Sequence, residues 1–143
     1  MTADNIQHKI KEKLTDAVLN MSVKNEKRLF VSVDPEKLVK AAGYLFSELK
    51  CRFVIATALQ SKQGFDIYYH FSKDAEGLII NLHVLLPVGH AEIDSLSNDF
   101  VAANWIEREI HELYGINFRN HPNLEKLISD GNWAEGVYPY RKE

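Results

Sequence analysis

The sequence predicts an α+β fold, in which an antiparallel sheet of about four strands carries helices on one face and an irregular C-terminal tail follows. Three observations predict it. Apolar residues recur with helical spacing in three separated segments, and two of these flank the stretch of residues 53–86, where the period changes to that of strands. Connections inside that stretch are short, as in an antiparallel meander. After Gly115 the chain turns polar and irregular.

Size and composition indicate one domain over residues 1–143. The chain has 143 residues, 45% of them apolar and 26% charged, which is typical of a soluble globular protein. A net charge of −3 gives no basic surface for nucleic acid or anionic lipid. The single cysteine, Cys51, excludes an internal disulfide framework and fits a reducing cytoplasm. Its place at a helix-to-strand junction, next to Arg52, could lower the pKa of its thiol. We expect a small buried residue instead, because free cysteines usually lie in the core.

Membrane insertion is not expected from this sequence. No apolar run approaches the roughly 20 residues that a bilayer requires. The N-terminus is charged and lacks the apolar core of a signal peptide. Any contact with a membrane should therefore be indirect, through a partner protein.

The N-terminal part predicts a helix and a short strand. The helix spans roughly residues 3–20, and the strand covers residues 29–33. The helix is indicated by apolar residues repeating every fourth position: Ile6, Ile10, Leu14 and Val18.

A second helix should begin at Asp34-Pro35 and end near Lys50. Aspartate is a favoured N-cap, and proline is favoured at the first helical position. A core-facing stripe supports the helix. Its members are Leu38, Ala42, Leu45, Phe46 and Leu49.

Three strands should follow. Residues 53–59 are apolar on both alternating sets, which predicts a strand buried on both sides. Residues 65–71 alternate most clearly, and residues 78–86 form a third strand that stops at Pro87.

The last predicted helix starts at a cap provided by Ser97, Asn98 or Asp99 and ends at Gly115. Residues 116–143 should form an extended docking tail, because they combine irregular sequence with large apolar side chains that need a surface to lie on. The apolar stripe of this helix consists of Trp105, Ile106, Ile110, Leu113 and Tyr114.

The charges of the last helix allow two interpretations. Arg108 and Glu112 are four residues apart, so they could form an ordinary ion pair on the helix surface. Alternatively, Glu107, Arg108 and Glu109 form desolvated pairs with neighbouring loops or with a partner, which would fix geometry more than add stability.

A metal or hydrolase site is the competing hypothesis. Glu107, His111 and His121 could ligate a metal, and a small metal-dependent hydrolase could use His111, Glu112 and His121. The spacing lacks the second histidine of a zincin motif, and no nucleophile or oxyanion device is visible. There is no glycine-rich phosphate loop, and without a CxxC pair the chain should ligate no iron–sulfur cluster.

The C-terminal residues resemble a known family. They are similar to the signature of the 30 kDa subunit of respiratory NADH dehydrogenase (complex I), which has counterparts in energy-converting [NiFe] hydrogenases and formate hydrogenlyases. The resemblance covers most of the chain, and its C-terminal part is the most specific. It rests on Glu107, Arg108, Glu109, Glu112, Leu113, Tyr114, Gly115, Ile116, Phe118, His121, Pro122, Leu124, Trp133, Gly136, Arg141 and Lys142.

The resemblance implies a non-catalytic subunit in the peripheral arm of such a complex, on the cytoplasmic side of the membrane. It implies packing on a large hydrogenase-like subunit and near a small iron–sulfur subunit. Iron–sulfur clusters, and flavin or nickel–iron, would then belong to partner subunits and not to this chain. The expected partner-facing residues are Glu107, Arg108, Glu109, Glu112, Tyr114, Gly115, Phe118, His121, Pro122, Trp133, Arg141 and Lys142.

Two departures from the complex I pattern stand out. Glu125 occupies a position where those subunits usually have arginine, so a salt bridge there does not carry over. The chain also closes soon after Arg141-Lys142, which resembles the hydrogenase-type branch.

Overall fold

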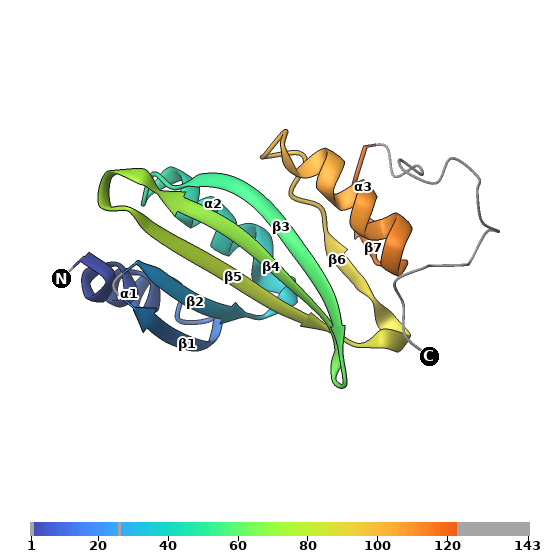
Figure 1. The fold of residues 1–143 in the computed structure, drawn as a ribbon, viewed down its shortest axis with the longest axis horizontal. Coiled ribbons are helices and arrows are strands. Elements are labelled where there is room, and N and C mark those ends of the chain that lie inside the picture. Colours follow the sequence, from blue (N-terminus) through green and yellow to red (C-terminus); the bar gives the residue numbers. More distant parts are fainter. Residues whose placement is uncertain (1, 26, 123–143) are drawn as a thin grey trace.

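A five-stranded sheet forms the centre of the molecule in the computed structural model, which describes residues 2–25 and 27–122 (Figure 1). The strand order is β1-β2-β5-β4-β3. All neighbouring pairs are antiparallel except β2 and β5, which run parallel. The strands are β1 (Val18–Asn25), β2 (Arg28–Val33), β3 (Arg52–Ser61), β4 (Gly64–Lys73) and β5 (Leu78–Leu86).

Helices cover one face of this sheet and leave the other open. On β4, Phe65, Ile67, Tyr69 and Phe71 point to the covered face and are fully buried, whereas the alternating residues are mostly half-buried. In Figure 1 helix α2 lies behind the sheet. The remaining helical and short elements are α1 (Thr2–Lys13), η1 (Pro35–Lys37), α2 (Leu38–Ser47), η2 (Asp74–Glu76), η3 (Val88–His90), β6 (Glu92–Asp94), α3 (Ala103–Tyr114) and β7 (Asn117–Arg119).

The predicted meander of three strands is confirmed. β4 pairs antiparallel with β3 on one side and with β5 on the other. β5 ends at Leu86, directly before Pro87, which cannot donate to the ladder. The predicted α+β architecture is therefore confirmed, with β1 added at one edge and the short parallel pair β6–β7 beside the main sheet.

The predicted first helix is too long. α1 ends at Lys13, and the segment from Val18 forms β1 instead. Ile6, Ile10 and Leu14 are buried as expected, but Val18 pairs with Val33 of β2. The helical spacing of apolar residues extends by chance to Val18. The conformation of the segment from Val18 is decided instead by its pairing with β2, the next strand of the chain.

The predicted second helix is confirmed at its start. The Asp34 side chain accepts a hydrogen bond from the Glu36 amide at 3.1 Å, and Pro35 opens the first turn, which is a 3₁₀ turn leading into α2. Leu38, Ala42 and Leu45 are fully buried. Phe46 was wrongly placed on the core face: its side chain is 54% exposed and packs edge-on against Phe100.

The prediction that β3 is buried on both sides is wrong. Val54, Ile55 and Leu59 are 41%, 48% and 42% exposed. β3 is an edge strand, and a bulge between Phe53 and Ile55 turns two consecutive side chains to the open face. As a result Phe53 and Ala56 face the core.

The predicted cap of the last helix is also wrong. α3 begins at Ala103 without a side-chain cap. The side chains of the polar residues before it are used elsewhere: the Ser97 hydroxyl lies 2.7 Å from Ser95 Oγ, and the Asn98 side chain donates to the Asn120 carbonyl. The predicted end is confirmed: Gly115 adopts φ of +77°, and its amide bonds back to the His111 carbonyl.

None of the helices in the described ranges, 2–25 and 27–122, combines the length and the apolar character needed to cross a membrane.

Replacement of Gly64 by alanine should strongly destabilise the chain. Gly64 has φ of +148°, and an added Cβ would lie 2.2 Å from the Leu86 carbonyl oxygen of the neighbouring strand. We expect the free energy of unfolding, measured with urea, to fall by about 1–3 kcal/mol. Gly43→Ala is the matched control, because an added Cβ would meet no atom within 4 Å outside its chain neighbours and its own helix backbone, and alanine favours the helix. A Gly64→Ala protein as stable as wild type would contradict this account.

Candidate functional site

Helix α3 and the short parallel sheet β6–β7 bring most of the described signature residues together. After α3, the left-handed conformation of Gly115 reverses the chain, so that β7 runs back beside β6 with Ile93 opposite Phe118. Ile116 and Phe118 are buried beneath the helix, at 0% and 2% exposure. This strand-helix-strand crossover, in which β7 is parallel to β6, anchors the segment that leads into the C-terminal tail.

Glu107 is the central side chain of this region. It is completely buried. One carboxylate oxygen accepts a hydrogen bond from Ser95 Oγ at 2.5 Å, and the other accepts from the Leu96 amide at 2.8 Å. His121 Nε2 lies 3.9 Å from the same carboxylate, and its side chain is also completely buried. Glu107 thus ties α3 to the loop after β6 and lies against the start of the tail.

Burial strongly perturbs the acidity of this carboxyl group. Desolvation raises the pKa of Glu107 from an ordinary value of 4.5 to about 7, against the opposing effect of the hydrogen bonds from Leu96 and Ser95. Tyr69, fully buried on β4, has its phenol pKa raised well above 10.0 by burial and by the nearby Glu107. A carboxyl that titrates near neutral pH therefore lies at the junction of helix, loop and sheet.

Arg108 and Trp105 lie on the outer side of the same helix. The Arg108 guanidinium lies over the Trp105 ring, 5.4 Å from its centre, a cation–π contact. Trp105 is 63% exposed, so its predicted place on the core stripe is wrong. The buried stripe runs instead through Ala103, Glu107 and Ile110, which turns Trp105 outward.

The residues suggested for a metal or hydrolase site are not arranged as one. His111 Nδ1 donates to the Ile116 carbonyl at 2.9 Å, and His121 Nε2 donates to the Asn104 carbonyl at 3.1 Å. Glu112 is buried. Within residues 2–25 and 27–122 no three histidine, cysteine or acidic side chains gather as ligands.

The other signature residues have structural contacts or lie beyond the described part. The Tyr114 hydroxyl donates to the Ala58 carbonyl at 3.3 Å, which joins α3 to the edge strand β3. Glu109 is half-buried and Pro122 is exposed. Cys51 is buried, and burial raises its thiol pKa to about 11, as expected for an unreactive core cysteine. Trp133, Arg141, Lys142 and the departure at Glu125 lie outside the described residues.

One polar constellation was missed from the sequence. On the open face of the sheet, Ser32 Oγ lies 3.0 Å from His83 Nδ1, and His83 Nε2 lies 2.6 Å from Asp66 Oδ1. The order hydroxyl, imidazole, carboxylate is that of a nucleophilic triad. However, Ser32 is the last residue but one of β2 and is paired with β1 on one side and β5 on the other, so the surrounding backbone amides serve the sheet and form no oxyanion hole. Its three members are far apart in sequence, and only the strand register shows their proximity.

Comparison with known proteins agrees with the geometry. Residues 31–143 match the family described as "Respiratory-chain NADH dehydrogenase, 30 Kd subunit". A subunit of the F(420)H(2) dehydrogenase of Methanosarcina mazei is 28% identical, over 100% of this chain and 92% of the relative. A subunit of the NADH-quinone oxidoreductase of Chelativorans sp. is 31% identical, over 94% of this chain and 68% of the relative.

Two solved structures share the fold. A chain from the membrane-bound sulfane sulfur reductase, an archaeal respiratory membrane complex, has a TM-score of 0.86 and 22% identity, over 99% of this chain and 84% of that one. The trypsin-resistant fragment of Nqo5 has a TM-score of 0.72 and 17% identity, over 87% of this chain and 100% of the fragment.

Stability should fall as the pH rises from about 4.5 to 7. In this window the folded chain keeps a proton on Glu107 that the unfolded chain has released, so rising pH favours unfolding. The loss should be on the order of 3 kcal/mol. Glu107→Gln should abolish this pH dependence, because glutamine does not titrate in this range. The fold should be retained, since the glutamine amide can still accept from the Leu96 amide and donate to Ser95 Oγ.

Urea unfolding of both proteins at several pH values between 4.5 and 8 measures this difference. Exposed Glu48 provides the matched control, Glu48→Gln, which should keep the wild-type dependence. An identical pH dependence in wild type and Glu107→Gln would show that Glu107 is not the titrating group.

Proposed function

Because this chain belongs to the family of the 30 kDa subunit of respiratory-chain NADH dehydrogenase, we propose that it is a non-catalytic structural and assembly subunit of a membrane-associated oxidoreductase complex. It docks in the peripheral arm, on the cytoplasmic side of the membrane, against a large hydrogenase-like subunit and a small iron–sulfur subunit. Iron–sulfur clusters, and flavin or nickel–iron, reside in those partner subunits.

The names of the relatives support a subunit role shared by several redox chemistries. One relative is a subunit of an F(420)H(2) dehydrogenase and another of an NADH-quinone oxidoreductase. The names of these complexes give different electron donors. The role that their related subunits share should therefore not depend on one particular donor. A scaffold subunit fits this pattern better than a catalytic one.

The observation that carries the proposal is that α3 turns Glu107 into the fold and leaves other large side chains on its outer side. Glu107 points inward and holds the helix on the loop at Ser95 and Leu96, while Trp105 and Arg108 stay on the outer side. Tryptophan and arginine are the residues most enriched in the energetic centres of protein interfaces. We assign the outer side of α3 as a docking surface whose position is set by Glu107.

The tail extends this docking surface in our proposal. The domain is a single unit over residues 1–143, and residues 116–143 act as its docking segment, with Trp133, Arg141 and Lys142 as contacts. The start of this segment, through Ile116 and Phe118, is held in the fold. The remainder continues from Pro122 beyond the described residues.

Affinity purification of the chain from detergent-solubilised native membranes tests the proposal. Mass spectrometry should identify a large hydrogenase-like subunit and a small iron–sulfur subunit as companions, and a flavin- or nickel-bearing companion would define the type of complex. Recovery of the chain alone would refute the scaffold role. Stoichiometric zinc or iron in the purified chain would favour the metal-dependent hydrolase with His111, Glu112 and His121.

Arg108→Ala should impair assembly more than folding. The side chain is half-buried and contacts the exposed Trp105 ring, so its removal should change the melting temperature of the isolated chain by about 2–4 °C. Loss of an interface arginine should reduce recovery of the companions about tenfold or more. Lys62→Ala, in the exposed turn between β3 and β4, is the control. Equal recovery with Arg108→Ala and wild type would refute the assigned surface.

A further inference from the structure

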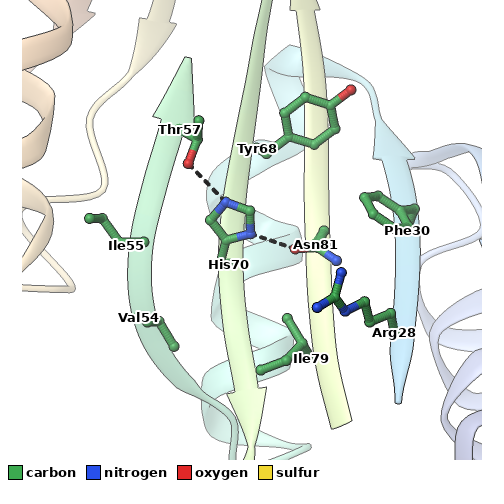
Figure 2. Close-up of a pocket in the computed structure, with 9 residues that line it drawn as sticks. All are labelled: Arg28, Phe30, Val54, Ile55, Thr57, Tyr68, His70, Ile79 and Asn81. Carbon is green, nitrogen blue, oxygen red and sulfur yellow. Dashed lines mark hydrogen bonds between the residues drawn. The ribbon is translucent and has the colours of Figure 1, made fainter. Parts of the chain in front are cut away.

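The open face of the main sheet carries a groove that the proposed function does not yet use. It crosses four adjacent strands, β2, β5, β4 and β3, and has a volume of roughly 460 Å³ (Figure 2). We call it the open-face groove. Its lining residues are Arg28, Phe30, Val54, Ile55, Thr57, Tyr68, His70, Ile79 and Asn81.

The walls of the open-face groove are apolar. Val54 and Ile55 are 41% and 48% exposed, because the bulge in β3 turns both outward. Phe30 and Tyr68 meet edge-on across the sheet, with ring centres 6.3 Å apart. The water-facing side of an antiparallel sheet is normally polar, and a continuous exposed apolar patch marks an interaction site.

The polar groups on the groove floor already have partners within the chain. His70 bonds to Thr57 Oγ1 at 3.0 Å through one ring nitrogen and to Asn81 Oδ1 at 2.5 Å through the other. The Asn81 amide nitrogen donates to the Leu29 carbonyl at 3.3 Å. An apolar surface can therefore cover Thr57, His70 and Asn81 without leaving these bonded groups unpaired, the usual cost of such a contact.

Arg28 is the exception. It is the one permanently charged residue among the nine that line the groove, and none of the nine is acidic. Figure 2 shows its guanidinium reaching from β2 toward Asn81 on β5. A covering surface would desolvate this cation, and a buried cation is tolerated only with an anionic partner. The covering surface must therefore bring a carboxylate to this end of the groove.

The dimensions fit a polypeptide segment. Three strand spacings of about 4.8 Å give a width of roughly 14 Å. A helix with its side chains is about 10–12 Å across, and an extended segment is narrower. A second copy of this chain is a poorer fit, because its own open-face groove would bring a second Arg28, and no acidic residue lines that groove.

We propose that the open-face groove binds a segment of a partner subunit that covers Phe30, Val54 and Tyr68 with apolar side chains and pairs an acidic side chain with Arg28. This inference rests on the proposed function and adds a second docking surface to it. The chain would then contact its complex both through α3 and through the face of the sheet that its own helices leave open.

Photo-crosslinking in the native complex tests the identity of the occupant. A photoreactive phenylalanine derivative replaces Val54, and the same derivative at Leu19, which is 70% exposed on β1, serves as the control. After irradiation, mass spectrometry should find position 54 joined to a partner segment with apolar residues and an acid nearby. Crosslinks to residues 123–143 of the same chain, to a second copy, or to nothing would each overturn the inference.

Charge reversal tests the ion pair. Arg28→Glu should lower recovery of the crosslinked subunit about tenfold or more, whereas Lys62→Glu, the same charge change in an exposed turn, should leave it unchanged. Replacing the acid of the crosslinked segment by arginine should restore recovery with Arg28→Glu. Failure of that rescue would overturn the pairing with Arg28.

The two proposals can fail separately. If the unmodified chain recovers its companion subunits while position 54 crosslinks to none of them, the scaffold role stands and the open-face inference falls. If the unmodified chain recovers no companion, the proposed function itself has failed.

Discussion

The burial of Glu107 is the constraint on which the described C-terminal part of the structure depends. A carboxylate at zero exposure requires polar partners, and here they are the Ser95 hydroxyl and the Leu96 amide, with His121 nearby. These contacts bring together the loop after β6, the middle of α3 and the segment after β7. Because the inward position of Glu107 sets the rotation of α3, it also determines that Trp105 and Arg108 lie outside.

The main sheet is organised by a second constraint, which is the coverage of one face only. The fully buried side of β4 supplies the core, and the other side remains open. On that open side, pairs such as His70–Asn81 and His83–Asp66 satisfy one another across the strands. Side chains whose polar atoms are already hydrogen-bonded are poor candidates for catalysis. They can be covered by a partner from which water is excluded, because no polar atom is left unpaired. Both docking surfaces that we assign thus rest on polar groups whose hydrogen bonds are made inside the chain.

Sequence patterns predicted the elements whose stability is local. Alternation predicted β4, an apolar run ending at Pro87 predicted β5, and Asp34 with Pro35 predicted the start of the second helix. Patterns failed where contacts outside the element decide. Val18 is strand because it pairs with Val33, and Ser97 caps no helix because its hydroxyl is bonded to Ser95 Oγ within the loop. The bulge in β3 shifted which residues face outward, which strict alternation cannot show.

By itself the sequence determined the class of fold, the three strands of the meander β3-β4-β5, the stop at Gly115 and the family resemblance that residues 31–143 bear out. These follow from periodicity, from turn-forming residues and from motif residues, all of which can be recognised in short stretches of the sequence. Only the tertiary structure decided that Glu107 is buried while Trp105 is exposed, and that an apolar groove with Arg28 at one end lies open. Periodicity shows that an element has two faces, but which face is covered depends on neighbours brought together from far along the chain.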